Sequence, residues 1–486
     1  MDAITTLPVM SPAAGEIFLA AAAMALLMFG VFKGGKAQEA TSWLAVAVLL
    51  IAGGLVLSHG GNTTPAFFGM FEAGPFAQFA KILILAGSIL SIIMSRSTFR
   101  QDSFERFEYP VLIVLSTLGM LMMVSANDMI ALYIGLEVQS LALYVIASIR
   151  RDTLRSTEAG LKYFVLGALS SGMLLYGSSM VYGFAGTTEF DTLATVFAGL
   201  EGEQPSVGLI IGLVFVICGL AFKVSAVPFH MWTPDVYEGA PTPVTALFAV
   251  APKVAALALF LRVLLEPFGA LVGEWQQIIA LIAVLSMAIG SIAAIVQTNI
   301  KRLMAYSSIG HMGYALVGLA AANEAGVSGI LVYLALYLFM NVGTFACILS
   351  MRRQGRLVEG IHDLAGLSKT HPGMAAMIMI FMFSMAGIPP LAGFFGKWFV
   401  FMAAVNAGLF ALAILGVIAS VIGAFYYLRI VKIMYFDEAE EPLDSAIPGD
   451  LKIIMTVMAA VTLLFFIVPA PLVSSAKAAA SALFAG

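Results

Sequence analysis

The sequence predicts an all-α polytopic membrane protein with about 14 transmembrane helices, two inverted five-helix repeats, and broken helices 7 and 12. Composition, the number of long apolar stretches, and prolines inside two of them carry this prediction. Hydrophobic residues fill 61% of 486 positions and charged residues 11%, whereas a soluble domain carries about 25% charged residues. The formal charge of −4 gives no reason to expect nucleic acid as a partner.

Long apolar stretches fill most of the chain. A helix needs about 20 apolar residues to cross the hydrocarbon core of a bilayer. Breaks rich in charge, glycine or proline separate fourteen such stretches, which are predicted to be spans. They cover residues 16–32, 42–58, 77–95, 109–125, 129–149, 159–183, 206–230, 242–265, 275–297, 303–322, 327–350, 373–403, 408–430 and 452–471. No basic segment precedes the first stretch, which favours a span over a cleavable signal peptide.

The distribution of basic residues between loops predicts the orientation. Short cytoplasmic loops collect Lys and Arg. If the N-terminus is outside, 17 of the 24 Lys and Arg residues fall in inside loops, and one, Lys477, falls outside. The inside loop at 231–241 has no basic residue and is a mild exception. This asymmetry predicts that both termini lie outside.

Two spans are interrupted at corresponding places. In the seventh, Pro228 cannot donate to the carbonyl of Val224, so the helix should kink or unwind beside Lys223. The twelfth contains Pro389-Pro390. Interrupted spans at matching positions of two repeats mark binding sites in transporters. These two are five spans apart, an odd number, so the repeats are expected to be inverted; the alternative, that the prolines only shape packing, stays open.

These spans predict four parts of the chain. Residues 1–108 form an N-terminal three-helix region, 109–265 the first five-helix repeat with spans 4–8, and 266–434 the second, inverted repeat with spans 9–13. Residues 435–486 carry span 14.

Four charged residues stand alone in these apolar stretches: Glu137, Lys223, Lys253 and Lys397. A charge at the centre of a span costs roughly 2.5–3.5 kcal/mol and usually faces the bundle interior or a water-filled cavity. Helical spacing places Tyr133, Ser140 and Tyr144 on one polar face with Glu137. Three amines and one carboxylate in such settings indicate movement of protons or ions, and we assign them to a proton relay.

Three further residues are weaker candidates for the relay: His230, His311 and Lys162. Each histidine could equally be a hydrogen-bonded packing residue. Lys162 and Lys81 lie near helix ends, where the amine can extend to the surface. Cys218 and Cys347 lack metal-ligand spacing, so no metal or cluster site is expected.

Three runs resemble a known family: Phe222–Thr242, Lys301–His311 and Gly387–Lys397. They resemble the antiporter-like subunits of the proton-pumping NADH:quinone oxidoreductase, respiratory complex I, and the resemblance covers nearly the whole chain. Through it, Glu137 matches the fifth-span glutamate of the family, and Lys223, Lys253 and Lys397 match the lysines of spans seven, eight and twelve.

The resemblance implies a non-redox subunit of a translocase that moves protons outward, driven by redox chemistry elsewhere. It implies no cofactor here, with NAD, FMN, iron-sulfur clusters and quinone in partner subunits. The partners implied are other membrane subunits of complex I, including neighbouring antiporter-like subunits, and the lipid bilayer. The location implied is a bacterial inner membrane with both termini periplasmic. No long amphipathic helix is expected after Pro471.

The predicted mechanism pairs Lys223 with Glu137, passes the proton to Lys253 and releases it outward through Lys397. Two alternatives remain open. A subunit of a multisubunit cation/proton antiporter would use the same buried charges and broken helices. A structural membrane scaffold would tolerate neutral residues at all four positions.

Overall fold

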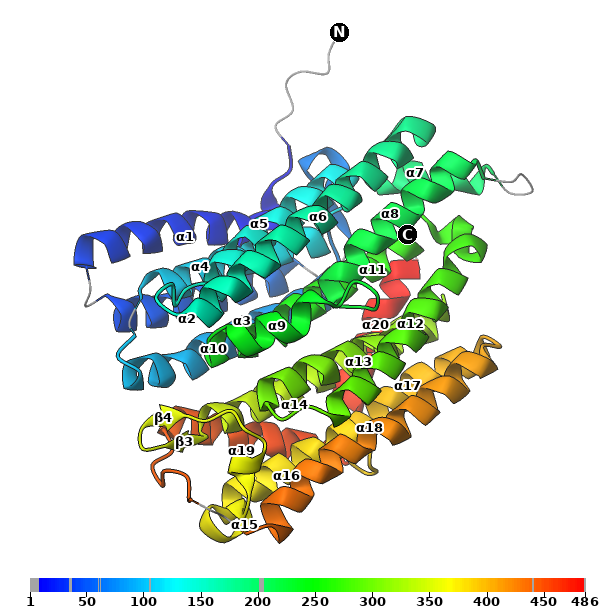
Figure 1. Cartoon of the computed structure of the whole chain (residues 1–486). Coiled ribbons are helices and arrows are strands. Elements are labelled where there is room, and N and C mark those ends of the chain that lie inside the picture. The colour runs from blue at the N-terminus through cyan, green and yellow to red at the C-terminus, as the bar shows by residue number, and fades with distance from the viewer. Residues whose placement is uncertain are drawn as a thin grey trace.

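The computed structural model describes residues 8–34, 37–59, 61, 63–104, 106–200, 205–438 and 441–484. The terminal residues, for which the sequence predicts the outer side, lie outside these ranges. Most of the described chain forms helices that run roughly alongside one another. In Figure 1 the N-terminal half occupies the upper part and the C-terminal half the lower part.

The helices lie between short connections. Their bounds are α1 (Ala14–Lys33), α2 (Gln38–His59), α3 (Pro75–Gln101), α4 (Glu108–Val124), α5 (Met129–Ala147), α6 (Leu154–Ala185), α7 (Phe190–Ala198), α8 (Val207–Val224), α9 (Trp232–Gly239), α10 (Thr242–Phe248), α11 (Ala251–Leu265), α12 (Val272–Ile295), α13 (Ile300–Ala320), α14 (Glu324–Leu349), α15 (Leu367–Thr370), α16 (Pro372–Ala386), α17 (Ala392–Asn406), α18 (Phe410–Phe436), α19 (Gly449–Leu464) and α20 (Ala470–Phe484). Short 3-10 helices cover Ser11–Ala13, Phe67–Gly69, Gly269–Leu271 and His362–Leu364.

Among the described residues, ten helical segments are long and apolar enough to cross a membrane by length and composition. They coincide with ten of the fourteen predicted stretches, and the protein is a multi-pass membrane protein. The other four stretches also contain helices. They are α4, which is apolar but has 17 residues, α13, the pair α16 and α17, and α19.

Both predicted breaks are confirmed. Helix α8 ends at Val224, and Ser225 adopts a left-handed conformation with φ of 62°. The chain resumes as α9 at Trp232. Helix α16 ends at Ala386, followed by Gly387 with φ of 89°, a conformation that glycine adopts without a side-chain clash. A third break, which the sequence did not predict, separates α10 from α11.

The interior is formed by α11 and α14, one from each half of the chain. In the most apolar 18-residue stretch of Thr242–Leu265, every residue is buried. In the corresponding stretch of Glu324–Leu349, 94% of the residues are buried. Small residues bring other helices close together. A Cβ on Gly119 of α4 would lie 2.3 Å from the backbone nitrogen of Gln139 in α5, and one on Gly290 of α12 would lie 2.5 Å from that of Gly310 in α13. Such close approach is typical of packing between membrane helices.

Two features differ from the all-α prediction. In the described part of the chain two antiparallel hairpins occur, β1 (Thr64–Ala66) with β2 (Phe71–Ala73) and β3 (Arg352–Arg353) with β4 (Arg356–Leu357). In these, Thr64 pairs with Ala73 and Arg352 with Leu357. Both hairpins are short turns between helices, so the helical architecture is unchanged.

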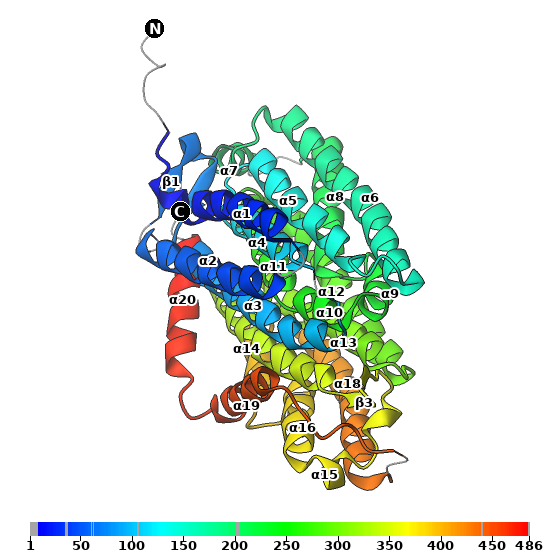
Figure 2. The same ribbon diagram turned by 90° about the vertical axis from the view of Figure 1, so that its left-hand side faces the viewer.

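The end of the last predicted span was wrong. Helix α19 ends at Leu464 rather than near residue 471, and α20 follows it. Figure 2 shows α20, in red, running along one edge of the molecule from α19 towards α3. It packs against α3 and α14, and Ser481 donates to Glu324 at 2.5 Å. The chain beyond Pro471 is therefore helical, but the helix α20, which begins at Ala470, has 15 residues and is not long.

Candidate functional site

Lys223 lies in the last turn of α8, and its Nζ faces α5. It donates to Ser140 Oγ at 2.8 Å and to Tyr144 OH at 3.5 Å. Both partners lie on the α5 face that the sequence predicted around Glu137. The ion pair expected between Lys223 and Glu137 is not formed among the described residues in this conformation. Ser140, one turn beyond Glu137, binds the ammonium group, and Glu137 Oε1 is buried without a hydrogen-bond partner in the described part of the chain.

Lys253 holds the broken end of α8 from the first turns of α11. Its Nζ donates to the carbonyl of Val224 at 3.1 Å and to Ser225 Oγ. The Val224 carbonyl is the one that Pro228 was predicted to leave free. Because Val224 directly follows Lys223, the two buried lysines meet at one interrupted helix end.

Lys397 holds the other broken end, that of α16, from the start of α17. Its Nζ donates to the carbonyls of Met385 at 3.0 Å and Ala386 at 3.1 Å, and to Ser420 Oγ of α18 at 2.8 Å. The ammonium also lies 4.6 Å from the ring centroid of Tyr314. Unpaired carbonyls at a helix C-terminus carry partial negative charge, so a cation at each broken end is favourable.

His311 lies in a cluster of hydroxyl groups between α13, α14 and α18. Its Nδ1 is 2.5 Å from Tyr333 OH and its Nε2 is 3.0 Å from Tyr427 OH. Tyr427 OH in turn lies 2.5 Å from Ser307 Oγ. His311 is 2% exposed, so both ring nitrogens have buried partners. Polar residues of the tenth and eleventh predicted stretches thus meet at this histidine.

Among the described residues, the remaining two candidates make no hydrogen bond to the buried lysines. His230 is half-buried in the segment between α8 and α9, and its Nδ1 has no hydrogen-bond partner among the described residues. Lys162 Nζ pairs with Glu158 at 2.7 Å and with Asp235 at 2.8 Å, and its side chain is 41% exposed. The structure therefore brings Lys162 into an ion-pair network rather than into contact with Lys223.

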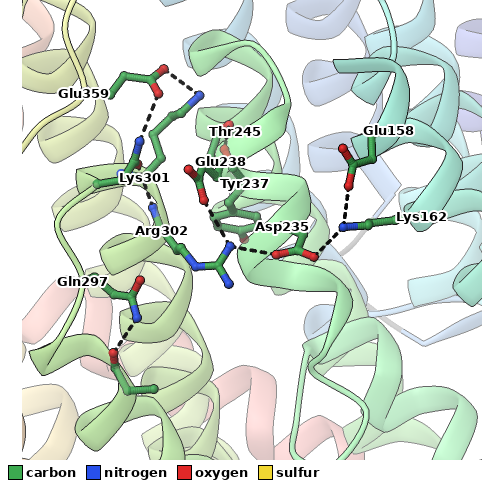
Figure 3. A network of polar contacts seen from close by, with 12 residues as sticks. Glu158, Lys162, Asp235, Tyr237, Glu238, Thr245, Gln297, Lys301, Arg302 and Glu359 are labelled. Atoms are coloured by element: carbon green, nitrogen blue, oxygen red, sulfur yellow. Dashed lines mark hydrogen bonds and ion pairs between the residues drawn. The ribbon is translucent and has the colours of Figure 1, made fainter. Parts of the chain in front are cut away.

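That network, drawn in Figure 3, was missed by the sequence analysis. Arg302 Nη1 pairs with Asp235 at 2.7 Å and with Glu238 at 3.1 Å. Nearby, Lys301 pairs with Glu359 at 2.7 Å. The sequence signal for this network was the helical spacing of Asp235 and Glu238. Both lie in the loop at 231–241, of which the sequence analysis noted only that it has no basic residue.

A cavity of about 630 Å³ with several charged residues in its walls opens beside this network. It lies between the start of α6, the junction of α9 and α10, and β4, and its walls include Asp102, Arg150, Glu238, Lys301 and Glu359. Lys223, Lys253 and Lys397 do not line it.

Two other buried charge pairs lie elsewhere. Lys81 was expected to reach the surface but is 2% exposed and pairs with Glu16 at 2.6 Å. Arg262, at the end of α11, pairs with Glu266 at 2.9 Å. Glu266 lies just past that helix, and burial raises the pKa of its carboxyl to about 7, against the lowering effect of Arg262. The pair of Lys81 and Glu16 joins α3 to α1, whereas Arg262 and Glu266 lie one turn apart at the end of the same helix.

Comparison with known proteins identifies the family of this chain. The transmembrane family described as NADH:quinone oxidoreductase/Mrp antiporter matches residues 126–423. NADH-quinone oxidoreductase subunit N of Rhodospirillum rubrum is 62% identical over 98% of both chains. That of Paramagnetospirillum magneticum is 60% identical over 97% of this chain and 98% of the relative.

Solved structures agree in fold. A chain of respiratory complex I from Thermus thermophilus with bound aureothin has a TM-score of 0.80 at 30% identity, covering 95% of this chain and 98% of that one. A chain of the Mrp complex from Dietzia has a TM-score of 0.83 at 20% identity, covering 97% of each, a likeness of fold alone.

Fold, buried lysines and family match define an antiporter-like transmembrane subunit that translocates protons. Within this class, the chain belongs to the NADH-quinone oxidoreductase subunit N family. It is thus a subunit of respiratory complex I, a membrane translocase.

Proposed function

We propose that this chain moves protons outward through a relay of Glu137, Lys223, Lys253 and Lys397. The observation that carries the proposal is the meeting of Lys223 and Lys253 at the end of α8. Lys253 binds the carbonyl of the residue next to Lys223, so a change at one lysine alters the surroundings of the other. Buried ionisable groups in membrane helices mark proton or ion pathways.

Lys397 is the outer member of the series in this proposal. It occupies the second interrupted helix in the manner that Lys253 occupies the first. His311 supports the step between them, because its ring lies 6.0 Å from that of Tyr314, which in turn contacts Lys397. His230 and Lys162 are secondary members of the proposed relay.

Glu137 acts on this relay without direct contact in the conformation described here. Ser140, which lies one turn from Glu137 on the same face of α5, binds the Lys223 ammonium group instead. Lys223 holds its proton while the carboxylate is near and releases it as the carboxylate moves away, because a nearby negative charge favours the protonated amine.

The same proposal includes fourteen spans in two inverted repeats, over 109–265 and 266–434, flanked by 1–108 and 435–486. Two matching pairs of features support it. The helix breaks follow α8 and α16, and the close glycine contacts join α4 to α5 and α12 to α13. Each pair falls at corresponding positions of the two repeats.

The driving force comes from outside this chain in the proposed scheme. NAD, FMN, iron-sulfur clusters and quinone act in partner subunits of the complex, and this subunit binds none of them. Its neighbours are other membrane subunits, including further antiporter-like ones. The complex lies in a bacterial inner membrane with both termini of this chain periplasmic.

The test is Lys223→Ala in the whole complex reconstituted into vesicles. We expect proton pumping driven by NADH oxidation to fall severalfold, because the amine that exchanges the proton is gone. Electron transfer from NADH to a soluble acceptor should stay normal and show that the complex assembles. Lys432→Ala is the control, since Lys432 is 62% exposed at the end of α18. Full pumping by an assembled Lys223→Ala enzyme would contradict the relay.

The alternative from the sequence, a subunit of a multisubunit cation/proton antiporter, is not proposed, because the chain is 62% identical to NADH-quinone oxidoreductase subunit N over 98% of its length. With the Mrp chain, at 20% identity, it shares the fold alone.

A further inference from the structure

Helix α9 is an isolated segment between two interruptions of the backbone. The chain is irregular from Ser225 to Met231 before it, and Ala240 and Pro241 separate it from α10. Because no continuous helix carries α9, its position must come from side-chain contacts.

The polar face of α9 is held by cations from both halves of the chain. Asp235 Oδ2 accepts a hydrogen bond from Lys162 of α6 at 2.8 Å, and Asp235 Oδ1 accepts one from Arg302 of α13 at 2.7 Å. Glu238, one turn further along α9, accepts a hydrogen bond from the same arginine at 3.1 Å. Figure 3 shows Asp235 between Lys162 and Arg302.

The first residues of α9 also contact the groups around Lys223 and Lys253. Trp232 is 3% exposed, and its Nε1 donates to the carbonyl of Phe222 at 3.1 Å, next to Lys223. Lys253 Nζ lies 5.3 Å from the Trp232 ring centroid. Thr233 donates to Ser225 Oγ at 2.6 Å, the same oxygen that accepts Lys253. A shift of α9 would therefore move groups that contact both lysines.

We propose that Asp235, with Arg302 and Lys162, is a positioning residue that clamps α9 and so fixes the surroundings of Lys253 and Lys223. The three side chains are between 31% and 41% exposed, and ion pairs this exposed contribute little to stability. The clamp thus sets the place of one segment and adds little to the stability of the fold. Its effect on pumping rests on the proposed relay, whereas its effect on α9 does not.

The test is Asp235→Asn in the assembled complex. We expect backbone amides across 225–241 to exchange hydrogen at least several times faster, while exchange in α11 and α14 is unchanged. Proton pumping should fall severalfold with normal electron transfer to a soluble acceptor. Asp235→Glu should restore both, because the carboxylate can still reach the two cations.

Asp152→Asn is the matched control, since Asp152 is an exposed aspartate of the α5–α6 connection without an ion-pair partner among the described residues. Unchanged exchange across 225–241 in Asp235→Asn would overturn the clamp, whatever the pumping rate. Faster exchange with full pumping would support the clamp and overturn its link to the relay. Failure of the relay itself is detected separately, by full pumping in Lys223→Ala.

Discussion

Each of the lysines Lys223, Lys253 and Lys397 binds at least two oxygen acceptors, and this explains how the membrane interior tolerates them. An ammonium group removed from water loses its hydration, and only well-placed hydrogen bonds or charges offset that loss. Lys397 has three acceptors, and Lys223 has two. Among the described residues, all acceptors of the three lysines are carbonyl or hydroxyl oxygens, and none is a carboxylate. This suits the proposed relay, in which the lysines take up and release a proton.

Ser140→Ala removes the shorter of the two hydrogen bonds of Lys223. A hydrogen bond to a charged group contributes about 1.5–3 kcal/mol, so the protonated lysine should lose about that much stabilisation. We expect a slower pumping rate in reconstituted vesicles with electron transfer to a soluble acceptor unchanged. Ser140→Thr keeps the hydroxyl and should pump nearly as well as the natural protein. Equal pumping by both variants would show that Ser140 does not hold the working state of Lys223.

At this scale, the charges could be predicted from the sequence but their partners could not. Glu137 and the three lysines were visible because each stands alone in an apolar stretch. Ser420 could not be assigned to Lys397, since helical periodicity places residues on a face without saying which faces meet. For the same reason, the hydrogen bond of Lys223 to Ser140 could not be told from the sequence, where Glu137 on the same face was the more obvious partner for an amine.

At the scale of elements, proline predicted the broken helices well. Pro228 and the pair Pro389-Pro390 each mark the place where a helix stops, for the reason that proline lacks the N–H of a continuing helix. The end of α19 was missed because residues 464–468 are as apolar as the span before them. The signal was Pro469 and Pro471, since proline is favoured in the first turn of a helix, here α20.

Gly393→Ala tests the packing of the second break. An added Cβ would lie 2.0 Å from the carbonyl oxygen of Ser384, where the start of α17 crosses the end of α16. Overpacking costs typically about 1–3 kcal/mol, and a backbone atom cannot move aside as a side chain does. We expect a lower temperature of thermal inactivation and weaker pumping.

The matched control is Gly373→Ala in the first turn of α16. Nothing lies within 4 Å of the Cβ that this change adds, and alanine favours a helix over glycine by roughly 0.5–1 kcal/mol. Its inactivation temperature should be equal or slightly higher. If both variants behave alike, the close approach at Gly393 does not matter for stability.

At the scale of the whole molecule, one carboxylate joins three distant parts of the chain. Asp102, at the end of α3, pairs with Arg150, which follows α5, and with Arg352 of β3 at 2.8 Å. The Arg352 side chain is 6% exposed, so Asp102 supplies the counter-charge for a nearly buried guanidinium group. The N-terminal helices and both halves of the antiporter-like fold therefore meet at a single acidic residue.

Asp102→Asn should loosen this junction. Removing one partner of a buried ion pair costs about 3–5 kcal/mol, and since Asp102 is 15% exposed, we expect about 2–3 kcal/mol here. The purified complex should lose activity on heating several degrees below the natural protein. Glu39→Gln breaks a comparable contact between α2 and α3, the pair with Arg96 at 3.1 Å, but Glu39 is 61% exposed. Exposed pairs contribute about 0–1 kcal/mol, so that variant should be nearly unchanged. Equal thermal inactivation of the two variants would mean that the junction at Asp102 holds no more than a surface pair does, and that packing alone joins the halves.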